Sequence, residues 1–201
     1  MESVDNKILM ILKKCGRGKV FFKQDLSRVS NPKRIQKALE QLVAAGKIIR
    51  VARGIYCYPK IDKLFNTGAE LPSYDEIAAA VAKRDGAKIV PTGAHALNLL
   101  GMSTQIPMNY VYFTDGKSRK IEISNGRNIT FIHTALKNLQ FKNKTAMLIT
   151  FALKAIGSEN VTELQIKHIT QIVRQEGREK IMQDIAKMPD WIKNIIIKTD
   201  D

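Results

Sequence analysis

Cysteine and the acidic residues are both scarce in this sequence. Its 201 residues include two cysteines, Cys15 and Cys57, too few for the disulfide framework of a small secreted domain. A bridge between them is possible, but two reduced thiols are the interpretation that we favour. Aspartate and glutamate number 19 against 33 lysines and arginines, a net charge of +14. So large an excess of positive charge indicates an anionic partner.

Long apolar runs are absent as well. No stretch of about 18 apolar residues occurs, so we expect no membrane-spanning helix. The N-terminal residues lack the basic, apolar and small-residue regions of a secretory signal. Hydrophobic residues still make up 44% of the chain, which is enough for a buried core. We therefore expect a soluble intracellular protein.

The usual signatures of catalysis and of metal binding are missing too. His95, His133 and His168 are far apart in the sequence, and no histidine or cysteine pair has the spacing of metal ligands. No glycine-rich phosphate loop is present. Asp75 and Glu76 are better explained as the acidic start of a helix than as a catalytic pair. We expect no metal, no cofactor and no enzymatic activity.

The positive charge is concentrated in the first third of the chain. Residues 1–65 hold 15 basic and 5 acidic residues, a net charge of +10, and the remainder carries +4. The periodicity of this part predicts helix, strand, short helix, helix and hairpin over residues 3–14, 20–22, 24–29, 31–45 and 47–58. That order is typical of a winged helix-turn-helix, a module that docks on duplex DNA.

The third of these helices has the clearest boundaries. Asn31 is a good N-cap, Pro32 suits the first helical position and Gly46 suits the residue after the end. Its apolar stripe comprises Ile35, Leu39, Leu42 and Val43. The opposite face comprises Lys33, Arg34, Lys37 and Gln41, with Glu40 at its edge. An ordinary solvated face is the alternative, but three cations without a carboxylate favour a recognition helix.

The hairpin that follows predicts a wing. Two β-prone runs flank Ala52-Arg53-Gly54, and glycine supplies the positive φ that a tight turn needs. Arg50 and Arg53 then lie near the tip, where an arginine can enter a minor groove or pair with phosphate. For Arg53 a solvated turn residue is the alternative. The candidate DNA-binding residues are thus Lys33, Arg34, Lys37, Gln41, Arg50 and Arg53.

The rest of the chain predicts a second domain. We place the boundary near residue 68, which gives a winged helix-turn-helix over 1–68 and an α+β domain over 69–201. Helices are predicted over 73–84, 92–100, 145–156, 162–176, 178–187 and 189–198, and strands over 88–90, 110–114, 120–124 and 129–133. The predicted fold class is α+β, with a small antiparallel sheet followed by a C-terminal helical bundle.

Aromatic residues suggest two further interpretations. Tyr56 with Tyr58 and Tyr110 with Tyr112 alternate along strands, and such pairs can stack on single-stranded bases. More often they pack one face of a sheet, so RNA binding is a minor alternative. Trp191 belongs to a strongly apolar last helix, which we expect to dock on the helical core rather than to form a dimer interface.

Two stretches resemble a known family. The first is the set of N-terminal helices that ends in the wing Arg53-Gly54-Ile55-Tyr56, and the second runs from Pro91-Thr92-Gly93-Ala94-His95 through Ser103-Thr104-Gln105-Ile106-Pro107 to Asp115. Together they are similar to the AbiEi-type antitoxins of type IV toxin–antitoxin (abortive infection) systems. The resemblance covers roughly residues 1–135, and the helices beyond residue 145 match no motif.

The resemblance implies a function that composition alone does not. It implies a bacterial cytoplasmic protein whose winged helix binds the operator of its own operon and represses it. It also implies that the second domain counteracts a nucleotidyltransferase toxin without a stable toxin complex. A plain winged-helix transcriptional regulator, with a ligand-sensing or dimerising second domain, remains the alternative.

Overall fold

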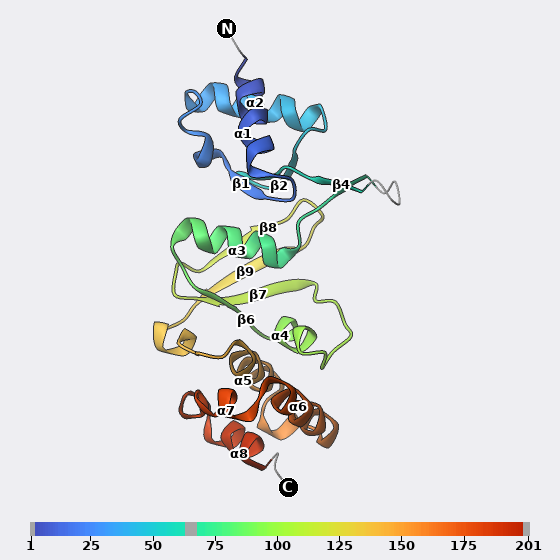
Figure 1. Cartoon of the computed structure of the whole chain (residues 1–201), viewed down its shortest axis with the longest axis vertical. Helices are drawn as coiled ribbons and strands as arrows, with labels where there is room; N and C mark the ends of the chain where they lie inside the picture. The colour runs from blue at the N-terminus through green and yellow to red at the C-terminus, as the bar shows by residue number, and fades with distance from the viewer. Residues whose placement is uncertain (1–2, 63–67, 199–201) are drawn as a thin grey trace. The chain divides into compact units, whose positions relative to one another are not determined.

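The computed structural model describes residues 3–62 and 68–198 (Figure 1). It confirms the α+β class and divides into two compact units. The N-terminal unit is Met1–Arg84 with Ile121–Arg127, and the C-terminal unit is Asp85–Lys120 with Asn128–Asp201. The boundary expected near residue 68 falls inside the N-terminal unit, because residues beyond it pack on the residues before it. One such contact places the guanidinium of Arg84 4.4 Å from the centroid of the Phe22 ring.

The N-terminal unit has the element order of a winged helix-turn-helix. Its elements are α1 (Val4–Cys15), β1 (Val20–Phe22), η1 (Lys23–Leu26), α2 (Pro32–Ala44), β2 (Ile49–Ala52), β3 (Ile55–Cys57), β4 (Lys60–Asp62), β5 (Gly68–Glu70) and α3 (Tyr74–Asp85). Strands β1, β3 and β2 form an antiparallel sheet in that order, and β4 and β5 form a separate hairpin.

The second helix of this motif differs from the prediction. The α-helix expected over residues 24–29 is instead the single 3₁₀ turn η1, Lys23–Leu26. The carboxylate of Asp25 accepts a 2.8 Å hydrogen bond from the N–H of Phe22, which ties the turn to the end of β1. A side chain that bonds back to the backbone in this way favours a short turn over a continued helix.

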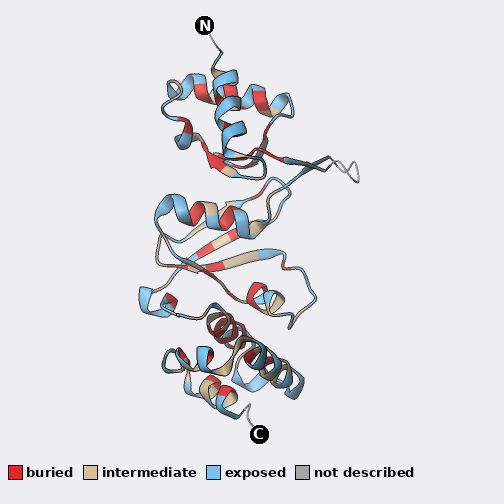
Figure 2. Ribbon diagram, viewed as in Figure 1, coloured by how far each residue is buried: buried red, intermediate tan, exposed pale blue. Residues whose placement is uncertain are grey.

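The core of the N-terminal unit lies between its helices and one face of its sheet (Figure 2). It comprises Ile8 and Leu12 of α1, Leu26 of η1, Ile35, Leu39 and Leu42 of α2, and Phe21, Tyr56 and Tyr58 of the sheet. Helices α1 and α2 contribute residues three or four positions apart, the spacing of one buried face. The cap of α1 is also as predicted, because Ser3 Oγ accepts a 3.3 Å hydrogen bond from the N–H of Asn6.

The C-terminal unit combines a sheet with helices. Its elements are β6 (Ile89–Pro91), α4 (Ala94–Leu99), β7 (Asn109–Thr114), β8 (Arg119–Glu122, of which the last two residues count with the N-terminal unit), β9 (Asn128–His133), η2 (Leu136–Leu139), α5 (Lys144–Ile156), η3 (Ser158–Asn160), α6 (Glu163–Glu176), α7 (Arg178–Met182), η4 (Ile185–Lys187) and α8 (Asp190–Lys198). The strand order is β6-β7-β9-β8. The sheet is mixed rather than purely antiparallel, because β9 takes the place beside β7 and runs parallel to it.

The helices of this unit build two clusters of buried residues, and α5 contributes to both. Ile149 and Leu153 of α5 are buried with Ile169 and Val173 of α6. Trp191 of α8 packs against the same cluster, so the last helix docks on the helical core as expected. The helix predicted over 178–187 is wrong in its second half, since α7 ends at Met182. The break allows the buried Asp184 to accept hydrogen bonds from the chain that begins α5.

The two cysteines do not form a disulfide. Cys15 is exposed, Cys57 is buried and both are free thiols, in agreement with the favoured interpretation. Across residues 3–62 and 68–198, no helix has the length and apolar character that crossing a membrane would require.

Candidate nucleic-acid interface

Helix α2 is positioned by signals at both of its ends. Asn31 Oδ1 accepts a 2.9 Å hydrogen bond from the N–H of Arg34, and Pro32 occupies the first turn. At the other end, the chain leaves the helix through Gly46 at φ 64°, a conformation that glycine adopts without strain. The apolar side of α2 faces the core, where Ile35, Leu39 and Leu42 are buried. The orientation of the opposite side is therefore fixed.

That opposite side carries the four residues singled out in the sequence. Lys33, Arg34, Lys37 and Gln41 are all exposed. At 3.6 residues per turn they fall within an arc of about 100°. The acidic residue at the edge of the arc is already engaged, because Glu40 Oε1 accepts a 2.7 Å hydrogen bond from Gln36 Nε2. The structure thus brings three cations and an amide together on one helical face.

The wing brings two further cations to the end of a hairpin. Ala52 pairs with Ile55, so Arg53 and Gly54 form a two-residue turn, and Gly54 has φ 74°. Arg53 is exposed at this turn, and Arg50 is exposed on β2 three residues before it. The register of β2 shifts between Arg50 and Ala52. Such a bulge increases the local twist of a strand and can re-aim a side chain.

A contact that the sequence did not predict supports the wing from its outer edge. Strand β2 lies at the edge of its sheet, and its Val51 carbonyl accepts a 2.9 Å hydrogen bond from the N–H of Ser124. Ser124 belongs to the turn that follows β8. In this turn, Asn125 Nδ2 donates a 2.7 Å hydrogen bond to the Tyr74 hydroxyl. The Arg127 guanidinium lies 5.7 Å from the centroid of the Tyr74 ring. No local pattern could have indicated a partner so distant in the sequence.

The chemistry of the six candidate residues suits a nucleic acid. Arginine presents a planar fork of N–H donors that matches phosphate and the major-groove edge of guanine, while lysine provides a mobile point charge. Gln41 can donate and accept at once, as adenine recognition requires. Phosphate contacts would position the module, and the arginine and glutamine contacts would read bases.

Three of the four tyrosines weighed as stacking platforms do not have the exposure that stacking needs. Tyr56, Tyr58 and Tyr112 are 2%, 7% and 1% exposed. Tyr56 instead packs against Phe21, with 5.7 Å between ring centroids. A base can stack only on an accessible ring face, so these rings belong to the cores of their units. Tyr110 is half-buried, and its ring lies edge-on to the His95 ring with 4.9 Å between centroids. Three of the four tyrosines are thus core residues, which leaves little accessible ring face for base stacking.

Metal-ligating residues do not gather anywhere in the described part of the chain. No three histidine, cysteine, aspartate or glutamate side chains of residues 3–62 and 68–198 lie close enough to share an ion. His133 Nδ1 lies 2.9 Å from the Gly116 carbonyl, and His168 Nε2 lies 2.8 Å from the Leu100 carbonyl. In each of these two rings, one nitrogen therefore lies within hydrogen-bond distance of a backbone carbonyl.

Comparison with known proteins places the chain in a family. The model of the "Family of unknown function (DUF6088)" matches residues 7–181, and no curated protein matches the sequence significantly. Among solved structures, the crystal structure of the RV2827C protein from Mycobacterium tuberculosis is similar, with a TM-score of 0.50 and 14% identity. The similarity covers 90% of this chain and 71% of that one, and at this identity it concerns the fold alone.

Proposed function

The chain belongs to the DUF6088 family, and we propose that it binds duplex DNA through α2 and the wing and represses its own operon. One observation carries this proposal. The five cations and one glutamine predicted from the sequence are all exposed on α2 and the β2–β3 hairpin, while the apolar sides of the same elements build the core. The surface is therefore available without any rearrangement of the unit.

The dimensions of α2 suit a duplex. Its 13 residues span about 20 Å, and a helix of this diameter enters the major groove. In helix-turn-helix proteins the N-terminal part of the recognition helix contacts base edges. Lys33, Arg34 and Lys37 lie in that part of α2. The arginines of the wing would then reach the adjacent backbone or minor groove.

The test is a salt-dependent binding measurement on the full chain. A duplex that spans the region upstream of its own gene should bind, and a structured RNA of equal length should not compete. If each of the five cations neutralises one phosphate, the slope of log affinity against log salt should approach about −4.5. A slope near zero, or equal binding to the RNA, would contradict the proposal.

We further propose that the C-terminal unit provides antitoxicity toward a nucleotidyltransferase toxin, as the resemblance to AbiEi-type antitoxins suggests. The second of the two resembling stretches, Pro91 to Asp115, forms the end of β6, α4 and β7. This contiguous piece lies within the C-terminal unit and contains none of the six candidate DNA-binding residues. The alternative is a plain transcriptional regulator with no toxin to oppose.

Co-expression with the adjacent gene separates these two functions. From an unrelated promoter, the chain should restore growth to cells that express the neighbouring toxin. A variant with Arg34→Ala and Lys37→Ala should rescue equally well, because both residues belong to α2 and not to the C-terminal unit. Absence of rescue by the wild-type chain would favour the plain regulator. Loss of rescue in the folded double variant would contradict the division of labour.

A further inference from the structure

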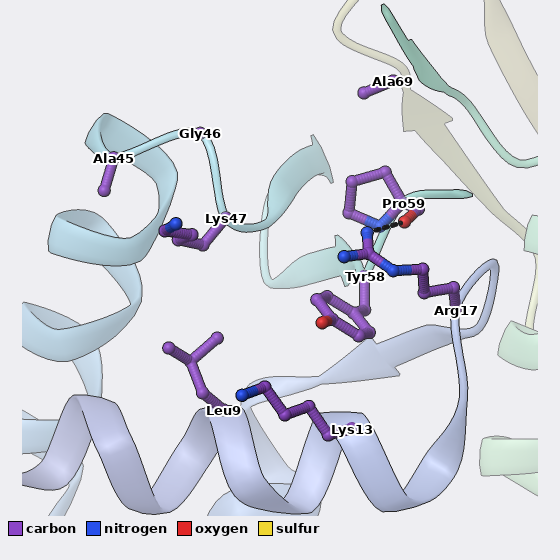
Figure 3. Close-up of a pocket in the computed structure, with 9 residues that line it drawn as sticks. All are labelled: Leu9, Lys13, Arg17, Ala45, Gly46, Lys47, Tyr58, Pro59 and Ala69. Atoms are coloured by element: carbon purple, nitrogen blue, oxygen red, sulfur yellow. Dashed lines mark hydrogen bonds between the residues drawn. The ribbon is translucent and has the colours of Figure 1, made fainter. Parts of the chain in front are cut away.

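A second cationic surface of the N-terminal unit is hollow. A cavity of about 460 Å³ lies where the C-terminal ends of α1 and α2 meet the open end of the β2–β3 hairpin (Figure 3). It is lined by Leu9, Lys13, Arg17, Ala45, Gly46, Lys47, Tyr58, Pro59 and Ala69. Its volume falls in the range of small-molecule sites.

The charge around this cavity has one sign. Lys13, Arg17 and Lys47 lie on three sides of it (Figure 3), and none of its nine described lining residues is acidic. A lysine in the last turn of α1 also complements the helix dipole, which explains Lys13 in part. Arg17 and Lys47 lie beyond the helix ends, so this explanation does not extend to them.

Arg17 is held in place before any ligand arrives. Its Nη1 donates a 2.9 Å hydrogen bond to the Pro59 carbonyl, and its guanidinium lies 4.7 Å from the centroid of the Tyr58 ring. Tyr58 is itself 7% exposed and belongs to the core. A guanidinium has five N–H donors, and the bond to Pro59 uses one of them. A preorganised donor lowers the entropic cost of binding an oxyanion.

The cavity lies beyond the C-terminal end of the DNA-binding face, one helical turn past Gln41. Lys47 lies three residues before Arg50, and Arg53 lies at the turn that closes the opposite end of the hairpin. Along α2, Ala45 lies eleven residues after Arg34, or about 16 Å at the helical rise. A duplex seated on the N-terminal part of α2 and the wing tip would therefore leave the cavity free.

We propose that this cavity binds a small organic anion. Its oxyanion group, a carboxylate, phosphate or sulfonate, binds to Lys13, Arg17 and Lys47, whose charges attract it. Its apolar body packs on Leu9 and on Pro59, which line the same cavity. The site differs from the DNA-binding surface in position and in ligand, and its occupancy is independent of the proposed function.

The test uses 8-anilinonaphthalene-1-sulfonate, a fluorescent anion with an apolar body, titrated into the full chain. The wild-type chain should bind one equivalent saturably, and AMP should displace it more effectively than inorganic phosphate. Lys13→Gln with Lys47→Gln should weaken binding about tenfold through the loss of two charge-assisted contacts. The matched control, Lys33→Gln with Lys37→Gln, removes the same charge from α2 and should leave affinity within about twofold.

A second variant keeps the test decisive if the first variant does not fold. Ala45→Leu fills the cavity from an exposed position at the end of α2 without changing the charge, and it should also weaken probe binding. Equal affinity in the wild type and in folded forms of both cavity variants would overturn the proposal, as would an equal loss in the matched control. So would displacement of the probe by a short DNA duplex, since the cavity would then belong to the DNA path. Failure of the chain to bind DNA leaves the probe titration unaffected, so the two proposals fail separately.

Discussion

The N–H of Ser124 donates a 2.9 Å hydrogen bond to the carbonyl of Val51, and this bond joins the wing to a turn far along the chain. Val51 is 1% exposed and lies at the irregular step of β2. A cavity of about 80 Å³ beside it is lined in part by Leu71, Tyr74 and Ile123. The edge of the wing sheet is thus supported by residues that a boundary at 68 would remove.

Loss of this hydrogen bond should destabilise the wing. Ser124→Pro removes the N–H and should lower the free energy of unfolding by about 1–3 kcal/mol, the cost of an unsatisfied buried acceptor. Ser124→Ala is the matched control, because the side chain is exposed and the N–H is kept. Urea unfolding of the full chain measures both. Equal midpoints for the two variants would show that the bond contributes nothing to stability.

Asp184 should make the C-terminal unit sensitive to acid. Burial alone would raise the pKa of this carboxyl, but hydrogen bonds from Lys187 and from the N–H groups of Asn143 and Lys142 hold the pKa below its ordinary value. A lowered folded-state pKa adds stability above the unfolded-state value of about 3.9, and this stability is lost as the pH falls through the folded-state pKa.

Asp184→Asn removes the charge while keeping the shape. It should cost about 1–3 kcal/mol at neutral pH, since hydrogen bonds to a charged group are replaced by weaker ones. The difference from the wild type should shrink below about pH 4. Thermal unfolding of both proteins across this range provides the measurement. A difference that stays constant with pH would contradict the role given to the charge.

The two thiols should react at very different rates. Burial, reinforced by the charge of Glu76 and opposed by that of Lys60, raises the pKa of the Cys57 thiol to about 11. The reactive species is the thiolate, and Cys57 is also 0% exposed. A thiol reagent should therefore label one cysteine in the native chain and two in the unfolded chain. Cys15→Ser should abolish the native reaction, and fast labelling that persists in this variant would contradict the burial of Cys57.

The predictions that succeeded rest on local signals. The cap of α2 could be identified because Asn31 bonds to a backbone group three residues away. The start of α3 follows the same logic, since Ser73 and Glu76 bond reciprocally, with 2.7 Å from the Ser73 N–H to Glu76 Oε2. Such motifs are complete within four residues, so the sequence alone contains them.

The predictions that failed concern residues that are distant in the sequence. The helix expected over 178–187 ends at Met182. Asp184 beyond it accepts hydrogen bonds from the N–H groups of Lys142 and Asn143, a pairing that no periodicity can indicate. The parallel pairing of β7 with β9 depends on strand order, and strand order is not encoded in alternation. The sequence did not indicate the cavity for the same reason, since two of its lining residues, Tyr58 and Pro59, lie far from Arg17 in the sequence. The charged face of α2 was predictable because one helix contains all of it.

Two neighbouring cations of α2 should play different roles in DNA recognition. Arg34 and Lys37 share the exposed face of α2, but an arginine can bind guanine with two hydrogen bonds, whereas lysine more often contacts phosphate. Leu39→Ala provides the control for stability. Leu39 is 0% exposed, and its truncation should cost about 2–5 kcal/mol of folding free energy through a core cavity.

The most direct test is the affinity of Arg34→Ala and Lys37→Ala for the operator and for a scrambled duplex, measured by fluorescence anisotropy. Arg34→Ala should lose about 1–3 kcal/mol on the operator and little on the scrambled site, with relaxed preference at one base pair. Lys37→Ala should weaken both duplexes equally and reduce the salt slope by about one. If both variants bind the operator as tightly as the wild-type chain, α2 is not the recognition helix and the central claim is wrong.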